Sequence, residues 1–239
     1  MKRKNEEIIT KLLSEIRRHD KPENRINYQR FFKEKLKEPI GLKTPVLRKV
    51  SSQQFKDIRQ WQAKDILDLC DDLLASGKRY MRFFVFEWAL KVKGQYAKSD
   101  FGRFERWLKK YVEGWGTCDH LCCGPLGYIL LRFPDLVSKT GPWVGSPNRW
   151  LRRAAAVSLI VPVRNGILLD EVFRAANNLL TDNEDLVQKG YGWMLKEAAN
   201  TYRKEVFTYV LKNKDRMPRT ALRYAIEKMP AAMRKKAMA

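Results

Sequence analysis

Four side chains of different types stand at related places in neighbouring segments of the sequence, and together they could act on a charged substrate. Asp119 is a carboxylate among basic residues, Arg153 is a guanidinium, and Trp115 and Trp193 carry indoles. A carboxylate stabilises a developing cation and positions or deprotonates water. An indole face attracts a cation, and a guanidinium holds a phosphate. These residue types fit a site for phosphate, sugar and base.

Each of these residues also has an ordinary structural interpretation. Trp115 and Trp193 could belong to a hydrophobic core, and Asp119 could cap the N-terminus of the helix that follows it. Arg152 and Arg153 could lie on a solvated helix face. A shared site therefore requires a fold that brings the four side chains together.

The elements that position these residues are predicted to be helices. Apolar residues recur at helical spacing over residues 8–16, 66–74 and 101–112, and the last two stretches stop at glycine. Strands with alternating apolar and polar residues and hairpin dipeptides are absent from the pattern. We therefore expect an all-α chain with short connections at Gly, Pro and Asn.

A repeated pattern favours an α-solenoid over a plain three- or four-helix bundle. Apolar helices open near residues 82, 118, 153, 189 and 219, a period of about 35. The helix at 118 is expected to run on towards Leu131, and second helices are expected over 170–180 and 202–211. We predict one domain, residues 1–239, of HEAT-like two-helix repeats that stack equivalent positions along a curved, concave binding surface.

The net charge indicates a polyanionic partner. The 239 residues hold 48 Lys and Arg against 27 Asp and Glu, a formal charge of +21. Nucleic acid is the first candidate partner and an anionic membrane the second. The longest apolar run, 154–163, is too short to cross a membrane, and the first residues lack a signal-peptide pattern. We expect an unprocessed cytoplasmic protein.

The repeat register gathers part of this charge beside Asp119. The residues expected to contact the DNA backbone there are Arg149, Arg152, Lys189 and Lys196. The two ends of the chain add further positive charge, with 15 basic and 7 acidic residues in 1–50, and 11 and 3 in 201–239. The positive charge at these ends would extend the surface that contacts a duplex.

A cluster of three cysteines, Cys118, Cys122 and Cys123, surrounds His120 and raises the question of a metal site. Structural zinc usually needs paired and separated groups of ligands, and the remaining cysteine and histidine are far away in the sequence. We expect reduced, buried thiols, with no metal and no cofactor.

Three motifs carry a resemblance to a known family: Trp115-Gly-Thr-Cys-Asp119, Asn148-Arg-Trp-Leu-Arg-Arg-Ala-Ala155 and Gln188-Lys-Gly-Tyr-Gly-Trp-Met-Leu-Lys-Glu-Ala198. In this order and spacing they resemble the AlkD-type DNA alkylation repair enzymes, which are HEAT-like alkylpurine DNA glycosylases of bacteria. The turn Gly41-Leu-Lys-Thr-Pro45 is similar too. The resemblance covers about residues 20 to 228.

The resemblance implies an activity: hydrolysis of the N-glycosidic bond of cationic alkylated purines of the 3-methyladenine and 7-methylguanine type in duplex DNA, within base excision repair. It implies that Asp119 is the catalytic carboxylate, that Arg153 holds a phosphate, and that Trp115 and Trp193 pack against the deoxyribose of the lesion. The chemistry agrees, because an alkylated purine already carries positive charge and leaves as a neutral base without a second acid.

The resemblance leaves several points open. An aromatic residue near the N-terminus of the family corresponds to Tyr28 or Phe32, and the spacing does not decide between them. His120 either tunes Asp119 or is exposed. We expect a monomer on double-stranded DNA in the cytoplasm, associated with the nucleoid in a bacterium, with no obligate protein partner. A non-catalytic HEAT-like binder of distorted or branched DNA and a protein-binding solenoid are the alternatives.

Overall fold

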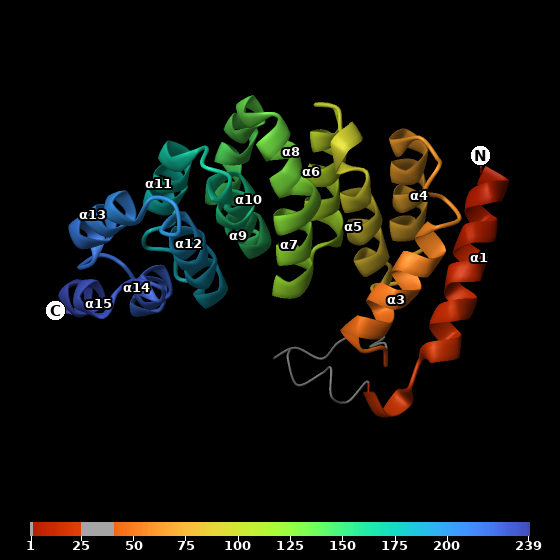
Figure 1. The fold of residues 1–239 in the computed structure, drawn as a ribbon, viewed down its shortest axis with the longest axis horizontal. Coiled ribbons are helices and arrows are strands. Elements are labelled where there is room, and N and C mark those ends of the chain that lie inside the picture. The colour runs from red at the N-terminus through yellow and green to blue at the C-terminus, as the bar shows by residue number, and fades with distance from the viewer. Residues whose placement is uncertain (1, 25–40) are drawn as a thin grey trace. The chain divides into compact units, whose positions relative to one another are not determined.

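A computed structural model of the chain describes residues 2–24 and 41–239, which form helices and no strand (Figure 1). The all-α prediction is confirmed. The chain divides into two compact units, Met1–Tyr96 and Ala97–Ala239. The expectation of a single domain over the whole chain stays a prediction. None of the described helices combines the length and the apolar character that crossing a membrane would need.

The first unit packs its helices around buried aliphatic and aromatic side chains such as Leu12, Phe84 and Trp88. The turn at 41–43 is fixed because Asp20 Oδ1 accepts a hydrogen bond from the backbone N of Gly41 at 2.7 Å. The elements are α1 (Lys2–His19), α3 (Thr44–Phe55), α4 (Ala63–Ala75), α5 (Met81–Lys91) and the short η1 (Lys93–Gln95).

The second unit contains every sequence-predicted site residue. Its elements up to the middle are α6 (Asp100–Tyr111), α7 (Trp115–Leu121), η2 (Cys122–Leu126), α8 (Gly127–Arg132), η3 (Pro134–Gly145) and α9 (Arg149–Val157). The remaining elements are α10 (Ile160–Arg164), α11 (Leu169–Asn178), α12 (Asp185–Ala198), α13 (Arg203–Asn213), α14 (Arg219–Ile226) and α15 (Ala231–Met238).

Four helices of this unit form one layer, in which α7, α9, α12 and α14 lie side by side in that order (Figure 1). They begin at residues 115, 149, 185 and 219, so successive starts are 34 to 36 residues apart. Helices α11 and α13 fall between them, close to the expected ranges 170–180 and 202–211. The period of about 35 and the α-solenoid are therefore confirmed, because equivalent helices of successive repeats are neighbours.

The helix expected to run unbroken from Cys118 towards Leu131 is wrong. Helix α7 ends at Leu121, and the chain departs from helical geometry at Gly124, with φ −104° and ψ −119°. Pro125 follows and has no N–H to donate to a preceding turn. The break lets the chain leave the layer of α7 and continue as α8, so a continuous apolar pattern here concealed two helices.

Helix α12 fits between its two neighbours because of two glycines on opposite sides. A Cβ at Gly190 would lie 3.1 Å from Cγ of Arg153 in α9. A Cβ at Gly192 would lie 2.7 Å from Cβ of Tyr224 in α14, a distance that real Cβ atoms do not show. The Gly-Tyr-Gly sequence before Trp193 thus sets how closely three repeats of the layer pack.

Candidate active site

Helix α7 places Trp115 and Asp119 one turn apart. Gly114 precedes the helix in an extended conformation and Trp115 is its first residue, so the two side chains occupy positions i and i+4 of one face. Trp115 is 41% exposed and is the single exposed large apolar side chain of the described residues. Neither ordinary interpretation applies, because Trp115 is outside the core and Asp119 lies inside the helix rather than at its cap.

Arg153 of α9 is paired directly with Asp119. Its Nε donates to Oδ1 and its Nη2 donates to Oδ2, each at 2.8 Å, and its Nη1 donates to the carbonyl of Leu186. The side chain of Arg153 is 6% exposed and that of Asp119 is 19% exposed. Burial acts to lower the pKa of Arg153, but the hydrogen bonds and charge of Asp119 outweigh it and hold that pKa above its usual value. The guanidinium is therefore charged, enclosed and fixed in orientation.

Trp193 of α12 is oriented by a buried carboxylate one turn later in the same helix. Its indole N–H donates to Oε1 of Glu197 at 3.1 Å, and Glu197 also accepts hydrogen bonds from Arg164 and Asn200, each at 3.0 Å. Burial acts to raise the pKa of Glu197, and the hydrogen bond and charge of Arg164, the Trp193 hydrogen bond and the charge of Lys228 hold it below its usual value. Glu197 is thus ionised at neutral pH and fixes the indole.

These side chains line one cavity of about 430 Å³. The structure brings together all four residues that the sequence predicts for the reaction, and two of the four predicted backbone-binding cations. The lining consists of Trp115, Asp119, Arg153, Leu186, Lys189, Trp193, Lys196 and Tyr224. Asp119 is the single carboxylate among these described residues, which also include two indoles and two lysines.

The four predicted backbone-binding cations fall into two groups. Lys189 and Lys196 line the cavity, where they pair with Asp185 at 2.6 Å and with Glu227 at 3.0 Å. Arg149 and Arg152 lie outside its lining. Their contact with DNA stays a prediction.

Arg152 has a structural position. Its Nε donates to Asp182 at 2.6 Å and its Nη1 donates to the carbonyl of Ser146 at 2.8 Å. The side chains of Arg152 and Asp182 are 18% and 9% exposed. Because Asp182 also accepts from the backbone N of Glu184, Arg152 ties α9 to the turn that starts α12. The solvated face considered for Arg152 and Arg153 is wrong.

The cysteine cluster lies behind the site. Cys118 Sγ lies 4.0 Å from Cys122 Sγ and 3.6 Å from the carbonyl of Trp150. Burial raises the pKa of Cys122, and burial with the charge of Asp119 raises that of Cys123 to about 12. These thiols are protonated at neutral pH, whereas a metal ligand or nucleophile is a thiolate. In the described part of the chain, no three His, Cys, Asp or Glu side chains are grouped to share a metal ion.

Two residues of the site are not among those predicted from the sequence. Glu197 and Tyr224 were missed, although both had a signal. Glu197 follows Trp193 by four residues, and Tyr224 is an aromatic residue in the helix that opens at 219, as Trp193 is in the helix that opens at 189. Tyr28 and Phe32 lie outside the described residues. His120 is half-buried, so full exposure is not its position.

Comparison with known proteins agrees with this fold. The solved structure of a predicted DNA alkylation repair enzyme from Enterococcus faecalis aligns with a TM-score of 0.76 over 89% of this chain and 98% of that one, at 17% identity. At this identity the likeness shows a shared fold.

No curated protein sequence matches the chain. A family model does match it: that of the DNA alkylation repair enzymes, over residues 12–229. The match includes α7, α9, α12 and α14, and with them every residue that lines the cavity around Asp119. The chain therefore belongs to the family of DNA alkylation repair enzymes, and its role is the repair of alkylation damage in DNA.

Proposed function

We propose that the protein is a DNA glycosylase, which hydrolyses the N-glycosidic bond of cationic alkylated purines in double-stranded DNA. The proposal narrows the repair role to one reaction and one class of lesion, those of the 3-methyladenine and 7-methylguanine type. In this proposal the protein acts as a monomer, without a cofactor or an obligate protein partner. One observation carries the proposal: a cavity that is lined by a single carboxylate, Asp119, and by the indoles of Trp115 and Trp193.

The lining suits a reaction whose positive charge moves from the base to the sugar. When the bond from C1′ to the purine nitrogen breaks, its electron pair neutralises the alkylated base, which leaves without a proton. The deoxyribose becomes cationic, and the Asp119 carboxylate and the indole faces stabilise it. A water oxygen then bonds to C1′, and its proton passes to Asp119 or to solvent. The products are a free base and an abasic site.

The surrounding residues hold these groups in place. Arg153 fixes both oxygens of Asp119, and Glu197 fixes the indole of Trp193. Such preorganisation lowers the cost of reaching the transition state. Lys189 and Lys196 supply positive charge for the DNA backbone beside the cavity.

The direct test is the release of bases from methylated duplex DNA, detected by mass spectrometry under enzyme excess. We expect the wild-type protein to free 7-methylguanine, and Asp119→Asn to lose release by at least about a hundredfold while it keeps duplex affinity. A duplex carrying a neutral damaged base is the control and should stay intact. If the wild-type protein releases no base, the glycosylase proposal fails. A protein that nevertheless binds branched or distorted DNA, equally well with Asp119→Asn, would be the non-catalytic alternative.

A further inference from the structure

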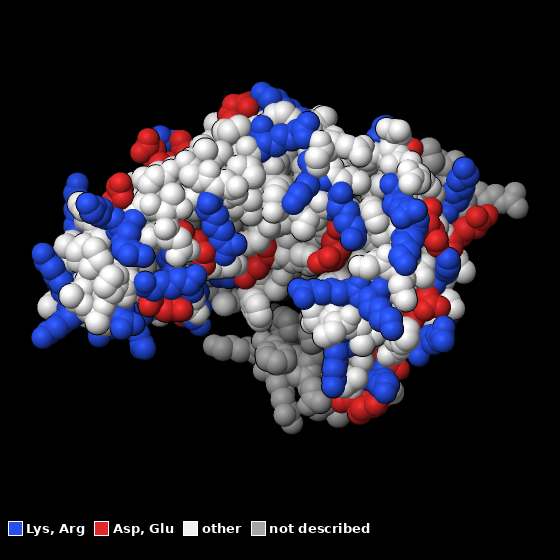
Figure 2. Space-filling model, in the orientation of Figure 1, with Lys and Arg blue, Asp and Glu red and all other residues white. Residues whose placement is uncertain are grey.

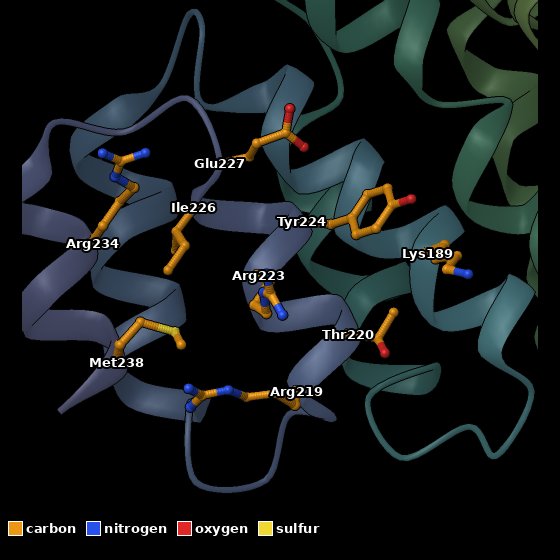
Figure 3. Close-up of a pocket in the computed structure, with 9 residues that line it drawn as sticks. All are labelled: Lys189, Arg219, Thr220, Arg223, Tyr224, Ile226, Glu227, Arg234 and Met238. Carbon is orange, nitrogen blue, oxygen red and sulfur yellow. The ribbon is translucent and has the colours of Figure 1, made fainter.

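A second cavity, of about 640 Å³, lies on α14 (Figure 3). Lys189 and Tyr224 line both cavities, so the two are neighbours. The second cavity is lined by Lys189, Arg219, Thr220, Arg223, Tyr224, Ile226, Glu227, Arg234 and Met238. Four of these are cations and one is an anion, and the nucleic-acid chemistry proposed above uses none of the three arginines.

The three arginines of this pocket carry charge that the protein leaves unpaired. Within residues 2–24 and 41–239, no carboxylate forms an ion pair with Arg219, Arg223 or Arg234, and all three are exposed. The other charged residues of the lining differ, since Lys189 pairs with Asp185 and Glu227 pairs with Lys196. The pocket therefore presents a positive potential to a ligand.

The three arginines come from two helices. Arg219 and Arg223 lie one turn apart on α14, and Arg234 comes from α15 (Figure 3). Met238 of α15 and the buried Ile226 give it an apolar part, which strengthens charge interactions by keeping water from one side. Helix α15 begins at Ala231, after the last residue of the family match at 229. Lys and Arg side chains also gather around this part of the molecule in Figure 2.

We propose that this pocket binds a backbone phosphate of the duplex whose damaged nucleotide lies at Asp119. Arginine forks match phosphate oxygens in geometry and charge. Exposure of all three guanidiniums fits a macromolecular ligand, because small-molecule sites bury most of their ligand. Because Lys189 and Tyr224 line both this pocket and the Asp119 cavity, a duplex seated at Asp119 passes next to the pocket. The inference rests on the glycosylase proposal only for the identity of that duplex.

The test compares two variants that each lose three positive charges. Arg219→Gln/Arg223→Gln/Arg234→Gln empties the pocket of its unpaired charge. Lys212→Gln/Lys235→Gln/Lys236→Gln removes three exposed lysines nearby that line neither cavity. We expect the pocket variant to bind an unmodified duplex about tenfold more weakly at moderate salt, and its log-affinity slope against log salt to fall by about 1 to 2. The lysine variant should change both less. Thermal unfolding confirms that both variants fold.

A second measurement separates a duplex from a free anion. Calorimetric titration with inorganic phosphate shows whether the pocket takes a small ligand. If only the pocket variant loses phosphate binding while its duplex affinity equals that of the lysine variant, the pocket serves a free phosphate and the inference is overturned. Equal duplex affinity and salt slope in the two variants overturn it as well. Base release is measured separately. If the wild-type protein releases no base but its duplex affinity still depends on the three arginines, the glycosylase proposal fails and the pocket proposal stands.

Discussion

Arg153 meets Asp119 fork to fork, with two parallel hydrogen bonds of 2.8 Å that occupy both carboxylate oxygens. The sequence predicts a guanidinium that holds a DNA phosphate. In the structure this guanidinium is 6% exposed, and its third donating nitrogen is bound to the carbonyl of Leu186. The geometry therefore favours a role in positioning the carboxylate over a direct grip on DNA.

The two roles of Arg153 give different results for Arg153→Gln. If Arg153 positions Asp119, base release falls by at least about tenfold while the salt dependence of duplex affinity is unchanged. If Arg153 contacts a phosphate, the salt slope falls by about 0.9. We expect the first result, together with a lower free energy of unfolding, since Asp119 loses its partner. Adding Asp119→Asn should recover part of that stability, because no single charge is then left unpaired.

Gly190 limits the space available to Arg153, and a methyl group there should disturb the pair. A Cβ at this position would lie 3.1 Å from Cγ and 3.2 Å from Nη1 of Arg153. We expect Gly190→Ala to lower base release and to lower the free energy of unfolding by about 1 kcal/mol, the usual cost of overpacking. Gly102→Ala in α6 is the control, because nothing lies within 4 Å of its Cβ. It should raise stability by about 0.5–1 kcal/mol through helix propensity alone. Equal effects of the two substitutions would contradict this.

The repeat period could be predicted from the sequence because apolar helices open at intervals of about 35 residues, and the observed starts at 115, 149, 185 and 219 keep that spacing. The break at Gly124 could not, because Pro125 is compatible with both a kinked helix and a turn between helices. The four residues of the site share a cavity as expected. The ion pairs could not be predicted. The carboxylate that pairs with Arg152 or Arg153 belongs to a neighbouring repeat, and the spacing of residues along one helix does not show which one it is.

Trp115 should be needed for base release but not for the stability of the fold. Its side chain is 41% exposed at the first position of α7, so Trp115→Ala removes little buried surface. We expect the free energy of unfolding to change by no more than about 0.5 kcal/mol, while base release falls at least about tenfold. Trp107→Ala is the contrasting variant, since this fully buried residue should cost about 3–5 kcal/mol of stability. A large loss of stability in Trp115→Ala would place that indole in the core instead.

Arg149 and Arg152 are predicted to have different roles: Arg149 contacts DNA at the surface, and Arg152 stabilises the packing of α9 against the turn before α12. Arg152→Gln breaks a pair with the 9% exposed Asp182 and a bond to the carbonyl of Ser146, so it should lower the free energy of unfolding by about 2–4 kcal/mol. Arg149 is 35% exposed and 3.7 Å from Glu184. Arg149→Gln should cost at most about 1 kcal/mol and lower the salt slope of duplex affinity. Chemical denaturation and affinity titrations at several salt concentrations measure both effects. A reversed order would show that Arg149, and not Arg152, joins the helices.

Glu197 should make both stability and the position of Trp193 dependent on pH. Its pKa in the folded protein lies below the usual value, because Arg164, Trp193 and Lys228 offset the effect of burial. The unfolded chain therefore binds a proton on Glu197 at a higher pH than the folded chain does. The stabilisation is complete above the ordinary glutamate pKa of about 4.3 and is lost as the pH falls through the lower folded value.

Glu197→Gln tests this carboxylate with little change in shape. We expect the variant to be less stable than the wild type at pH 7, because Arg164 loses a charged partner, and the difference to shrink as the pH falls below about 4.3. Denaturation at a series of pH values measures it. Intrinsic fluorescence reports on the Trp193 indole by difference. The spectrum of Trp193→Phe is subtracted from that of the wild type, and the spectrum of Trp193→Phe/Glu197→Gln from that of Glu197→Gln. Base release at pH 7 should be lower in Glu197→Gln than in the wild type. Glu197→Asp should restore it only if the shorter carboxylate still accepts the hydrogen bond of Trp193. A stability difference that stays constant with pH would mean that Glu197 contributes packing and not charge.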